Sequence, residues 1–143
     1  DRLLTPTPIS PPIAESVRAR VLVIDDELPV ASMLSRVLAD QHDVHLATSA
    51  REALELLSNQ DFDVILCDLL MPGMSGMDLH AELASRTPGA EQRMVFMTGG
   101  AFTPRAAEFL ARVKNPRLEK PFDLSRMRQL VLDLASRFRT GTP

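Results

Sequence analysis

The most constraining feature of this sequence is a regular alternation of short apolar runs with longer segments of helical periodicity. Residues 20–24 have the sequence Arg-Val-Leu-Val-Ile, and such a β-branched, apolar run is typical of a strand covered on both faces. Four similar runs follow, and the five predicted strands span residues 20–24, 43–47, 63–67, 93–97 and 117–119. Because a helical pattern follows each run, the sequence predicts an α/β fold, a doubly wound, five-stranded parallel sheet with helices on both faces.

Helix starts are predicted from capping residues as well as from apolar periodicity. Pro29 lies in the first turn of the first predicted helix, where a missing N–H costs nothing. Ser49 is predicted to cap the second helix, with Glu52 three residues further on, as in a capping box. The remaining predicted helices span residues 77–86, residues 104–113 after a Thr103 cap, and a last segment capped by Asp123.

The opening stretch differs in composition from the rest of the 143-residue chain. Four prolines lie within residues 1–19, and because proline fixes φ and removes hydrogen-bond donors, we interpret this stretch as a linker or tail. A flexible tail is the simpler interpretation, and a tether to a preceding domain is the alternative. One domain is expected to occupy residues 20–139, followed by a short tail over residues 140–143. Since the chain begins with Asp rather than Met, we expect it to be part of a longer protein.

Composition disfavours several classes of protein. The formal net charge of −3 argues against a sequence-independent nucleic-acid binder, which normally carries a basic stripe. The single cysteine, Cys67, allows no internal disulfide and fits a reducing compartment, so a cytoplasmic location is expected. No apolar run approaches the roughly 18–20 residues needed to cross a bilayer, so no membrane contact is expected. Since Trp and Tyr are absent, the core must be mainly aliphatic, with Cys67 as one small apolar member.

Polar residues follow the predicted strands at the points where the strands end. Asp25 and Asp26 come directly after the first strand, and Asp68 follows the third. Thr98 follows the fourth strand and Lys120 the fifth. Because ligands of such sheets bind outside the carboxyl ends of the strands, we expect all five side chains to converge on one edge.

These residue types together indicate phosphoryl chemistry. Three carboxylates that lie close together repel one another, so the cluster needs raised pKa values or a bound cation. Oxygen ligands suit a hard divalent cation, and we predict Mg²⁺, or Mn²⁺ in its place, with Asp25 and Asp26 as the metal-binding pair. An Asp carboxylate is a known nucleophile in phosphoryl transfer, and Asp68 is predicted to accept the group because it ends a central strand. The predicted phosphoryl contacts are the Lys120 ammonium, the Thr98 hydroxyl and the backbone N–H groups of Leu69 and Gly99.

Four motifs resemble those of the two-component response-regulator receiver domain. They are Val-Leu-Val-Ile-Asp-Asp-Glu at 21–27, Leu-Cys-Asp-Leu-Leu-Met-Pro-Gly-Met-Ser-Gly at 66–76, Met-Thr-Gly-Gly at 97–100 and Lys-Pro-Phe at 120–122. Each motif alone is moderately specific, but all four in this order make a strong match over about residues 20–138. The resemblance implies a flavodoxin-like strand order of 2-1-3-4-5, Mg²⁺ dependence and phosphotransfer from a histidine kinase or a phosphotransfer protein.

The resemblance also implies a role for each site residue. It matches the family's phosphoacceptor to Asp68, its acidic metal pair to Asp25 and Asp26, its switch hydroxyl to Thr98 and its lysine to Lys120, with the backbone carbonyl of Leu70 completing the metal shell. The expected parent is a hybrid sensor histidine kinase with this receiver at its C-terminus, and a free-standing regulator is the alternative. Family members often form homodimers through their fourth and fifth helices on phosphorylation, so a homodimer is an expected state.

One departure from the family pattern concerns signal output. Arg117 lies three positions before Lys120, where the family often has an aromatic residue that moves together with the threonine hydroxyl. The usual coupling to Thr98 is therefore not expected. The loop after Thr98, with Phe102 as its nearest aromatic residue, is the alternative route for the signal.

A second departure concerns the lifetime of the phosphorylated state. Leu70 and Gly100 lie two positions after Asp68 and Thr98, where family members often carry polar side chains that orient the attacking water. Neither residue offers such a side chain, so we expect slow self-dephosphorylation.

Two other classes of protein remain as alternatives. An aspartate-nucleophile phosphatase on a similar scaffold needs a second Asp two residues after the nucleophile as general acid, and Leu70 occupies that position. A receiver-like interaction module that is never phosphorylated is expected to have lost an acidic residue, the threonine or the lysine, and none is lost here. The sequence therefore favours a phosphorylatable switch.

Overall fold

The computed structural model describes residues 18–99 and 103–139 of the chain. The predicted linker up to residue 17, the tail at 140–143 and the predicted roles of Gly100 and Phe102 lie outside these residues. The described chain forms one five-stranded sheet with the order β2-β1-β3-β4-β5, and all four strand pairs are parallel. This arrangement confirms the doubly wound fold and the flavodoxin-like strand order.

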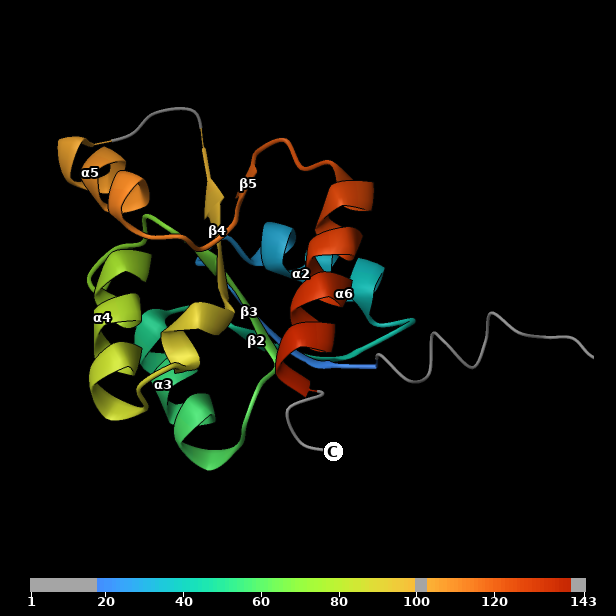
Figure 1. The fold of residues 1–143 in the computed structure, drawn as a ribbon. Coiled ribbons are helices and arrows are strands. Elements are labelled where there is room, and N and C mark those ends of the chain that lie inside the picture. The colour runs from blue at the N-terminus through green and yellow to red at the C-terminus, as the bar shows by residue number, and fades with distance from the viewer. Residues whose placement is uncertain (1–17, 100–102, 140–143) are drawn as a thin grey trace, which may run out of the picture.

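Helices cover both faces of the sheet (Figure 1). The strands are β1 (Arg20–Ile24), β2 (Asp43–Ala47), β3 (Val64–Asp68), β4 (Met94–Thr98) and β5 (Arg117–Glu119). The helices are α2 (Leu28–Leu38), α3 (Ala50–Asn59), α4 (Gly76–Arg86), α5 (Pro104–Arg112) and α6 (Leu124–Arg139), with a 3-10 turn, η1 (Ala90–Arg93), before β4. Helices α2 and α6 pack on one face, and α3, α4 and α5 pack on the other. Within the described ranges, no helix combines the length and apolar character needed to cross a membrane.

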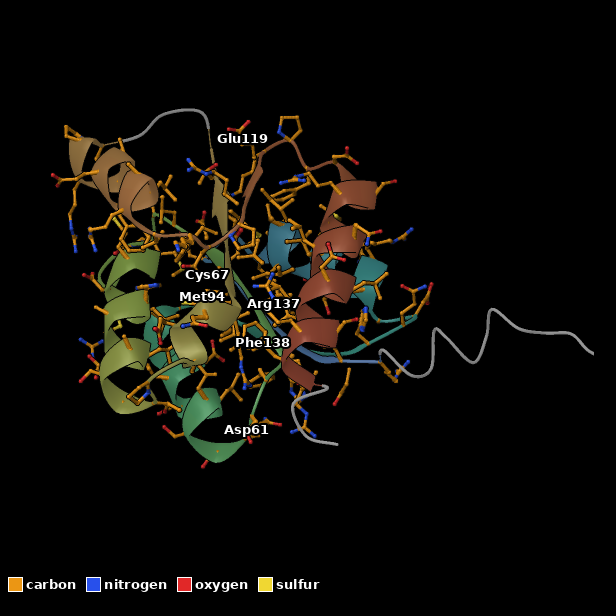
Figure 2. The ribbon with its side chains drawn as sticks, viewed as in Figure 1. Asp61, Cys67, Met94, Glu119, Arg137 and Phe138 are labelled. Atoms are coloured by element: carbon orange, nitrogen blue, oxygen red, sulfur yellow. The ribbon has the colours of Figure 1, made fainter. Side chains whose placement is uncertain are left out.

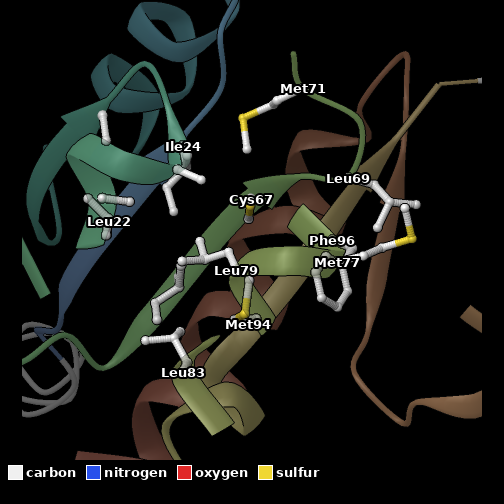
Figure 3. Close-up of a cluster of buried hydrophobic side chains, with 14 of the residues drawn as sticks. Leu22, Ile24, Cys67, Leu69, Met71, Met77, Leu79, Leu83, Met94 and Phe96 are labelled. Atoms are coloured by element: carbon white, nitrogen blue, oxygen red, sulfur yellow. The ribbon is translucent and has the colours of Figure 1, made fainter. Parts of the chain in front are cut away.

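The central strands are buried on both faces because their side chains alternate between two apolar clusters. In β3, Ile65 and Cys67 pack with α3, α4 and α5, whereas Val64 and Leu66 pack with α2 and α6. Figure 3 shows Cys67 among the apolar side chains of the first cluster. Cys67 is fully buried and burial raises the pKa of its thiol, which confirms that it is a core residue. Each large apolar side chain buried here stabilises the fold by about 1.5–3 kcal/mol.

Two strands begin one residue later than predicted. Asp63 precedes β3, and its carboxylate accepts a hydrogen bond from the Arg20 N–H at 2.9 Å. Arg93 belongs to η1 instead of β4, and its guanidinium donates to the Phe62 carbonyl at 2.9 Å. At both positions the side chain contacts a segment that lies far away in the sequence.

The predicted helix caps are present, with one difference in detail. The Ser49 hydroxyl accepts from the Glu52 N–H at 3.1 Å, as predicted. The Glu52 carboxylate, however, accepts from the Thr48 N–H at 2.7 Å rather than from the Ser49 N–H, so the predicted capping box is not reciprocal. A complete capping box occurs at α4 between Ser75 and Asp78, where none was predicted. Thr103 and Asp123 cap α5 and α6 as predicted.

The described chain enters the sheet through Ala19. This residue is buried, its N–H donates to Nδ1 of His42 at 3.0 Å, and its carbonyl accepts from the Asp43 N–H at 2.8 Å. One residue of the predicted linker is therefore packed against the turn between α2 and β2.

Candidate functional site

Four parallel strands bring the predicted site residues to one edge of the sheet. Asp25 directly follows β1, Asp68 ends β3, Thr98 ends β4 and Lys120 directly follows β5. The Lys120 N–H donates to the Thr98 carbonyl at 2.8 Å, which continues the pairing of β4 and β5 and fixes the start of the lysine side chain beside the threonine. Because the strands are parallel, their carboxyl ends must lie at the same edge. The predicted convergence of these residues is confirmed.

Three carboxylates form the acidic part of this site. One oxygen from each of Asp25, Asp26 and Asp68 lies within 4.8 Å of the others. Asp25 is fully buried, Asp68 is only 7% exposed and Asp26 is exposed. Oδ1 of Asp25 accepts from the Glu27 N–H at 2.9 Å, whereas its buried Oδ2 has no hydrogen-bond partner. A buried oxygen without a hydrogen bond, in a cluster of hard oxygen donors, fits a divalent cation.

The Lys120 ammonium faces three carboxylates at similar distances. Nζ lies 3.5 Å from Oδ1 of Asp68, 3.6 Å from Oδ2 of Asp25 and 3.7 Å from Oε1 of Glu27. Glu27 was not among the predicted site residues, although it directly follows the acidic pair in the sequence.

Burial and mutual repulsion set the pKa values of the cluster. Burial raises the pKa of Asp68 to about 6; the Asp25 carboxylate adds to the shift and the Lys120 ammonium opposes it. Burial also raises the pKa of Asp25, against the hydrogen bond from Glu27 and the charge of Lys120. For Lys120, burial acts to lower the pKa, but the carboxylates of Asp68, Asp25 and Glu27 outweigh it and the pKa rises. The cluster thus carries more negative charge than one lysine neutralises.

A cavity of about 290 Å³ opens above Asp68. Thr98 is buried, and its Oγ1 has no hydrogen-bond partner, so the hydroxyl is free to donate to a group in the cavity. Gly99 is exposed at the rim of the cavity, and no atom lies within 4 Å of the position that a Cβ would take there. The lining residues are Asp26, Glu27, Asp68, Leu69, Leu70, Met97, Thr98, Gly99 and Lys120.

The backbone of Leu69 is engaged differently from the prediction. Its N–H donates to the Met97 carbonyl at 3.0 Å, which continues the pairing of β3 and β4. The contact of this N–H with a phosphoryl oxygen stays a prediction.

The two departures from the family pattern have defined positions. Leu70 is 40% exposed and lines the cavity. An apolar side chain therefore lies at a position where family members often carry a polar one. Arg117 is exposed, and its Nη2 donates to the Leu110 carbonyl at 3.4 Å, near the C-terminal end of α5. Arg117 therefore links β5 to α5 through its guanidinium.

Comparison with known proteins agrees with this geometry. The response regulator receiver domain model matches residues 21–132. This chain belongs to the response-regulator receiver family. The receiver is 34% identical over 115 residues to the response regulator protein PilR of Pseudomonas aeruginosa, a match that covers 80% of this chain and 25% of PilR. It is 36% identical over 116 residues to the regulatory protein AtoC of Escherichia coli, covering 78% of this chain and 24% of AtoC.

A solved structure is also similar. A response regulator receiver domain protein from Clostridium thermocellum matches this receiver with a TM-score of 0.74 and 26% sequence identity, over 85% of this chain and 98% of that chain. The receiver spans about a quarter of the length of PilR and AtoC, so the family assignment applies to the receiver domain itself.

Proposed function

We propose that this receiver domain is a phosphoacceptor switch that takes a phosphoryl group from a phosphohistidine onto Asp68. The observation that carries the proposal is the position of the Asp68 carboxylate, below an open cavity and between two groups that suit a phosphoryl oxygen. Lys120 lies 3.5 Å from Asp68, and the buried Thr98 hydroxyl has no partner. Among the described residues, the Thr98 hydroxyl makes no hydrogen bond and the Lys120 ammonium makes only ion pairs. Both groups can therefore contact the oxygens of a phosphoryl group on Asp68 without breaking a hydrogen bond between neutral groups.

In the proposed transfer, an oxygen of the ionised Asp68 carboxylate attacks phosphorus in line with the leaving imidazole. A P–O bond forms, the P–N bond breaks, and the imidazole nitrogen keeps the electron pair of that bond. Positioning and charge stabilisation are the main sources of rate enhancement in such a transfer. Lys120 supplies positive charge, and the Gly99 N–H and the Thr98 hydroxyl supply donors.

The acidic cluster is proposed to hold Mg²⁺ or Mn²⁺. Asp25, Asp26 and Asp68 would contribute carboxylate oxygens, and Leu70 would contribute its backbone carbonyl. A bound cation would neutralise charge on the transferring oxygens, which one lysine cannot do alone. The buried Oδ2 of Asp25, which accepts no hydrogen bond, supports this assignment.

The proposed partners are a histidine kinase or a phosphotransfer domain as phosphodonor and a protein that binds the phosphorylated surface. The proposed domain runs from residue 20 to residue 139, with a linker or tail over residues 1–19, of which Ala19 packs against the domain, and a tail over residues 140–143. Attachment to a hybrid sensor histidine kinase, a cytoplasmic location and a phosphorylation-dependent homodimer are further parts of the proposal.

The proposal is tested by intact mass measurement after incubation with acetyl phosphate, with and without Mg²⁺. We expect one added phosphoryl group that requires the cation, and borohydride reduction of the acyl phosphate should mark Asp68 in the peptide map. A folded protein that takes up no phosphoryl group under these conditions would support the unphosphorylated interaction module instead. Modification of a different residue would contradict the assignment of Asp68.

The phosphorylated state is expected to be long-lived because Leu70 offers no group that orients water. Replacing Leu70 with Asn should speed loss of the phosphoryl group about 3- to 10-fold, since an amide at the cavity wall can position the attacking water. The decay of the phosphorylated species, followed by intact mass after removal of acetyl phosphate, measures this rate. Leu70→Met keeps an apolar side chain of similar size and should decay like the wild type, whereas equal rates for all three proteins would contradict the explanation.

A further inference from the structure

We propose that Glu27 is a positioning residue that holds the Lys120 ammonium at the mouth of the phosphoacceptor cavity. This inference rests on the proposed phosphotransfer to Asp68 for its effect on rate. The positioning itself is a property of the domain before any phosphoryl group arrives. The ion pair that carries it joins Nζ of Lys120 to Oε1 of Glu27 at 3.7 Å.

The backbone of Glu27 is held on both sides. Its N–H donates to Oδ1 of Asp25 at 2.9 Å, and its carbonyl accepts from the N–H groups of Val30 and Ala31, each at 3.1 Å. Glu27 is the N-terminal cap residue of α2, but its side chain makes no capping hydrogen bond. Helix caps are usually Ser, Thr, Asp or Asn, whose short side chains bond the first turn. The longer Glu side chain is instead free to reach Lys120.

The three carboxylates around Lys120 differ in what else they are needed for. Asp25 and Asp68 belong to the acidic cluster, and their oxygens are the ones that a cation or a phosphoryl group engages. Glu27 lies outside that cluster, and its side chain is 62% exposed at the cavity wall. It is therefore the one partner that Lys120 keeps when the other two carboxylates are engaged.

A second anchor matters because lysine has a flexible side chain. The four-carbon stem of Lys120 has many rotamers, so its ammonium is not fixed by its backbone alone. The backbone is fixed by the hydrogen bond to Thr98 at 2.8 Å. Attraction to Glu27 limits the ammonium to conformations that face the cavity, which reduces the ordering needed when it contacts a phosphoryl oxygen.

The test uses Glu27→Gln, which removes the charge and keeps the size of the side chain. In the metal-free protein, NMR relaxation of the Lys120 Cε methylene group should show greater side-chain mobility in the variant. The rate of phosphorylation by acetyl phosphate at saturating Mg²⁺ should fall about 1.5- to 5-fold, as expected for an exposed ion pair. The affinity for Mg²⁺ should stay within twofold of the wild type, because Glu27 is not a member of the cluster.

Two further variants separate positioning from a general charge effect. Glu27→Asp keeps the charge on a shorter stem and should give values between the wild type and Glu27→Gln. Glu119→Gln removes an exposed charge next to Lys120 at the same end of the sheet (Figure 2) and should change neither Lys120 mobility nor rate.

Each outcome decides the inference. Unchanged Lys120 mobility in Glu27→Gln would overturn the positioning itself. Greater mobility with an unchanged or faster rate would overturn its proposed effect on phosphotransfer. A faster rate would mean that Glu27 competes with the phosphoryl group for the lysine. If the wild type takes up no phosphoryl group at all, the proposed function fails, while the mobility measurement still decides whether Glu27 positions Lys120.

Discussion

The Asp68→Asn variant is expected to take up no phosphoryl group and to be more stable than the wild type when both are metal-free at pH 7.5. No phosphoryl group is added because the side-chain amide of Asn is not a nucleophile toward acetyl phosphate. Stability rises because Asn removes a nearly buried charge that lies within 4.8 Å of the oxygens of Asp25 and Asp26. The residue that we propose for function is thus one that disfavours folding until a cation is bound.

The pH dependence of this gain follows from the raised pKa of Asp68. The ordinary pKa of an Asp side chain is 3.8, whereas burial raises the pKa of Asp68 to about 6 in the folded domain. Because the folded state holds the proton more tightly, the contribution of Asp68 to stability is fully present below pH 3.8 and is lost as the pH rises from 3.8 through about 6. We expect the Asn variant to gain about 2–3 kcal/mol at pH 7.5 and roughly half as much at pH 5.

Urea unfolding in a chelating buffer, followed by far-UV circular dichroism because the chain has no Trp, measures this gain. The matched control is Asp61→Asn, which removes an exposed charge at the opposite end of the sheet (Figure 2) and should change stability by less than about 0.5 kcal/mol. Saturating Mg²⁺ should reduce the difference in the free energy of unfolding between Asp68→Asn and the wild type, since a ligand that binds the folded state stabilises the wild type by mass action. Equal stability of Asp68→Asn and the wild type at pH 7.5 would contradict the account of the cluster.

The convergence of the site was predictable because topology alone requires it. Once the apolar runs are recognised as parallel strands, Asp68 and Thr98 must lie at one edge, whatever their side-chain conformations. The first residues of β3 and β4 were less predictable. Asp63 and Arg93 have side chains that bind backbone groups of distant segments, at Arg20 and Phe62, and no local pattern records those contacts.

Contacts that depend on side-chain reach were not predictable. Glu27 follows the acidic pair in the sequence, but only the position of Lys120 after β5 shows which way its carboxylate turns. The link between α4 and α5 is similar, because Arg105 donates to Asp78 at 2.9 Å across two helices. The hydrogen bond from the Leu69 N–H to the Met97 carbonyl was not predictable for a different reason, since it depends on the register of β3 and β4.

Gly76 brings the backbone of α4 against the backbone of Asp68 and Leu69. Its N–H donates to the Leu69 carbonyl at 2.9 Å. A Cβ added at Gly76 would lie 2.7 Å from the Asp68 carbonyl oxygen and 3.1 Å from the Leu69 Cα. These are backbone atoms of a buried segment, so they cannot rotate away as the end of a flexible side chain can. The absence of a side chain at residue 76 is what allows α4 to begin there.

Gly76→Ala is therefore expected to destabilise the domain by about 1–3 kcal/mol, the usual cost of overpacking a filled core. This loss should appear even though Ala is the better helix former by about 1 kcal/mol in a helix interior. To relieve the clash, either the start of α4 or the Asp68 backbone must move. We expect movement of the Asp68 backbone to slow phosphorylation by acetyl phosphate several-fold, because small misplacements of a reacting group have large effects on rate.

Urea unfolding and the phosphorylation rate at a temperature where all proteins are folded measure the two effects. Gly99→Ala is the matched control, since no atom lies within 4 Å of its added Cβ and the donor N–H of residue 99 remains. Its stability should stay within about 0.5 kcal/mol of the wild type and its rate should be little changed. A Gly76→Ala domain as stable as the wild type would mean that α4 shifts without cost. A loss of stability with an unchanged rate would mean that α4 yields and that the Gly76 contact does not position Asp68.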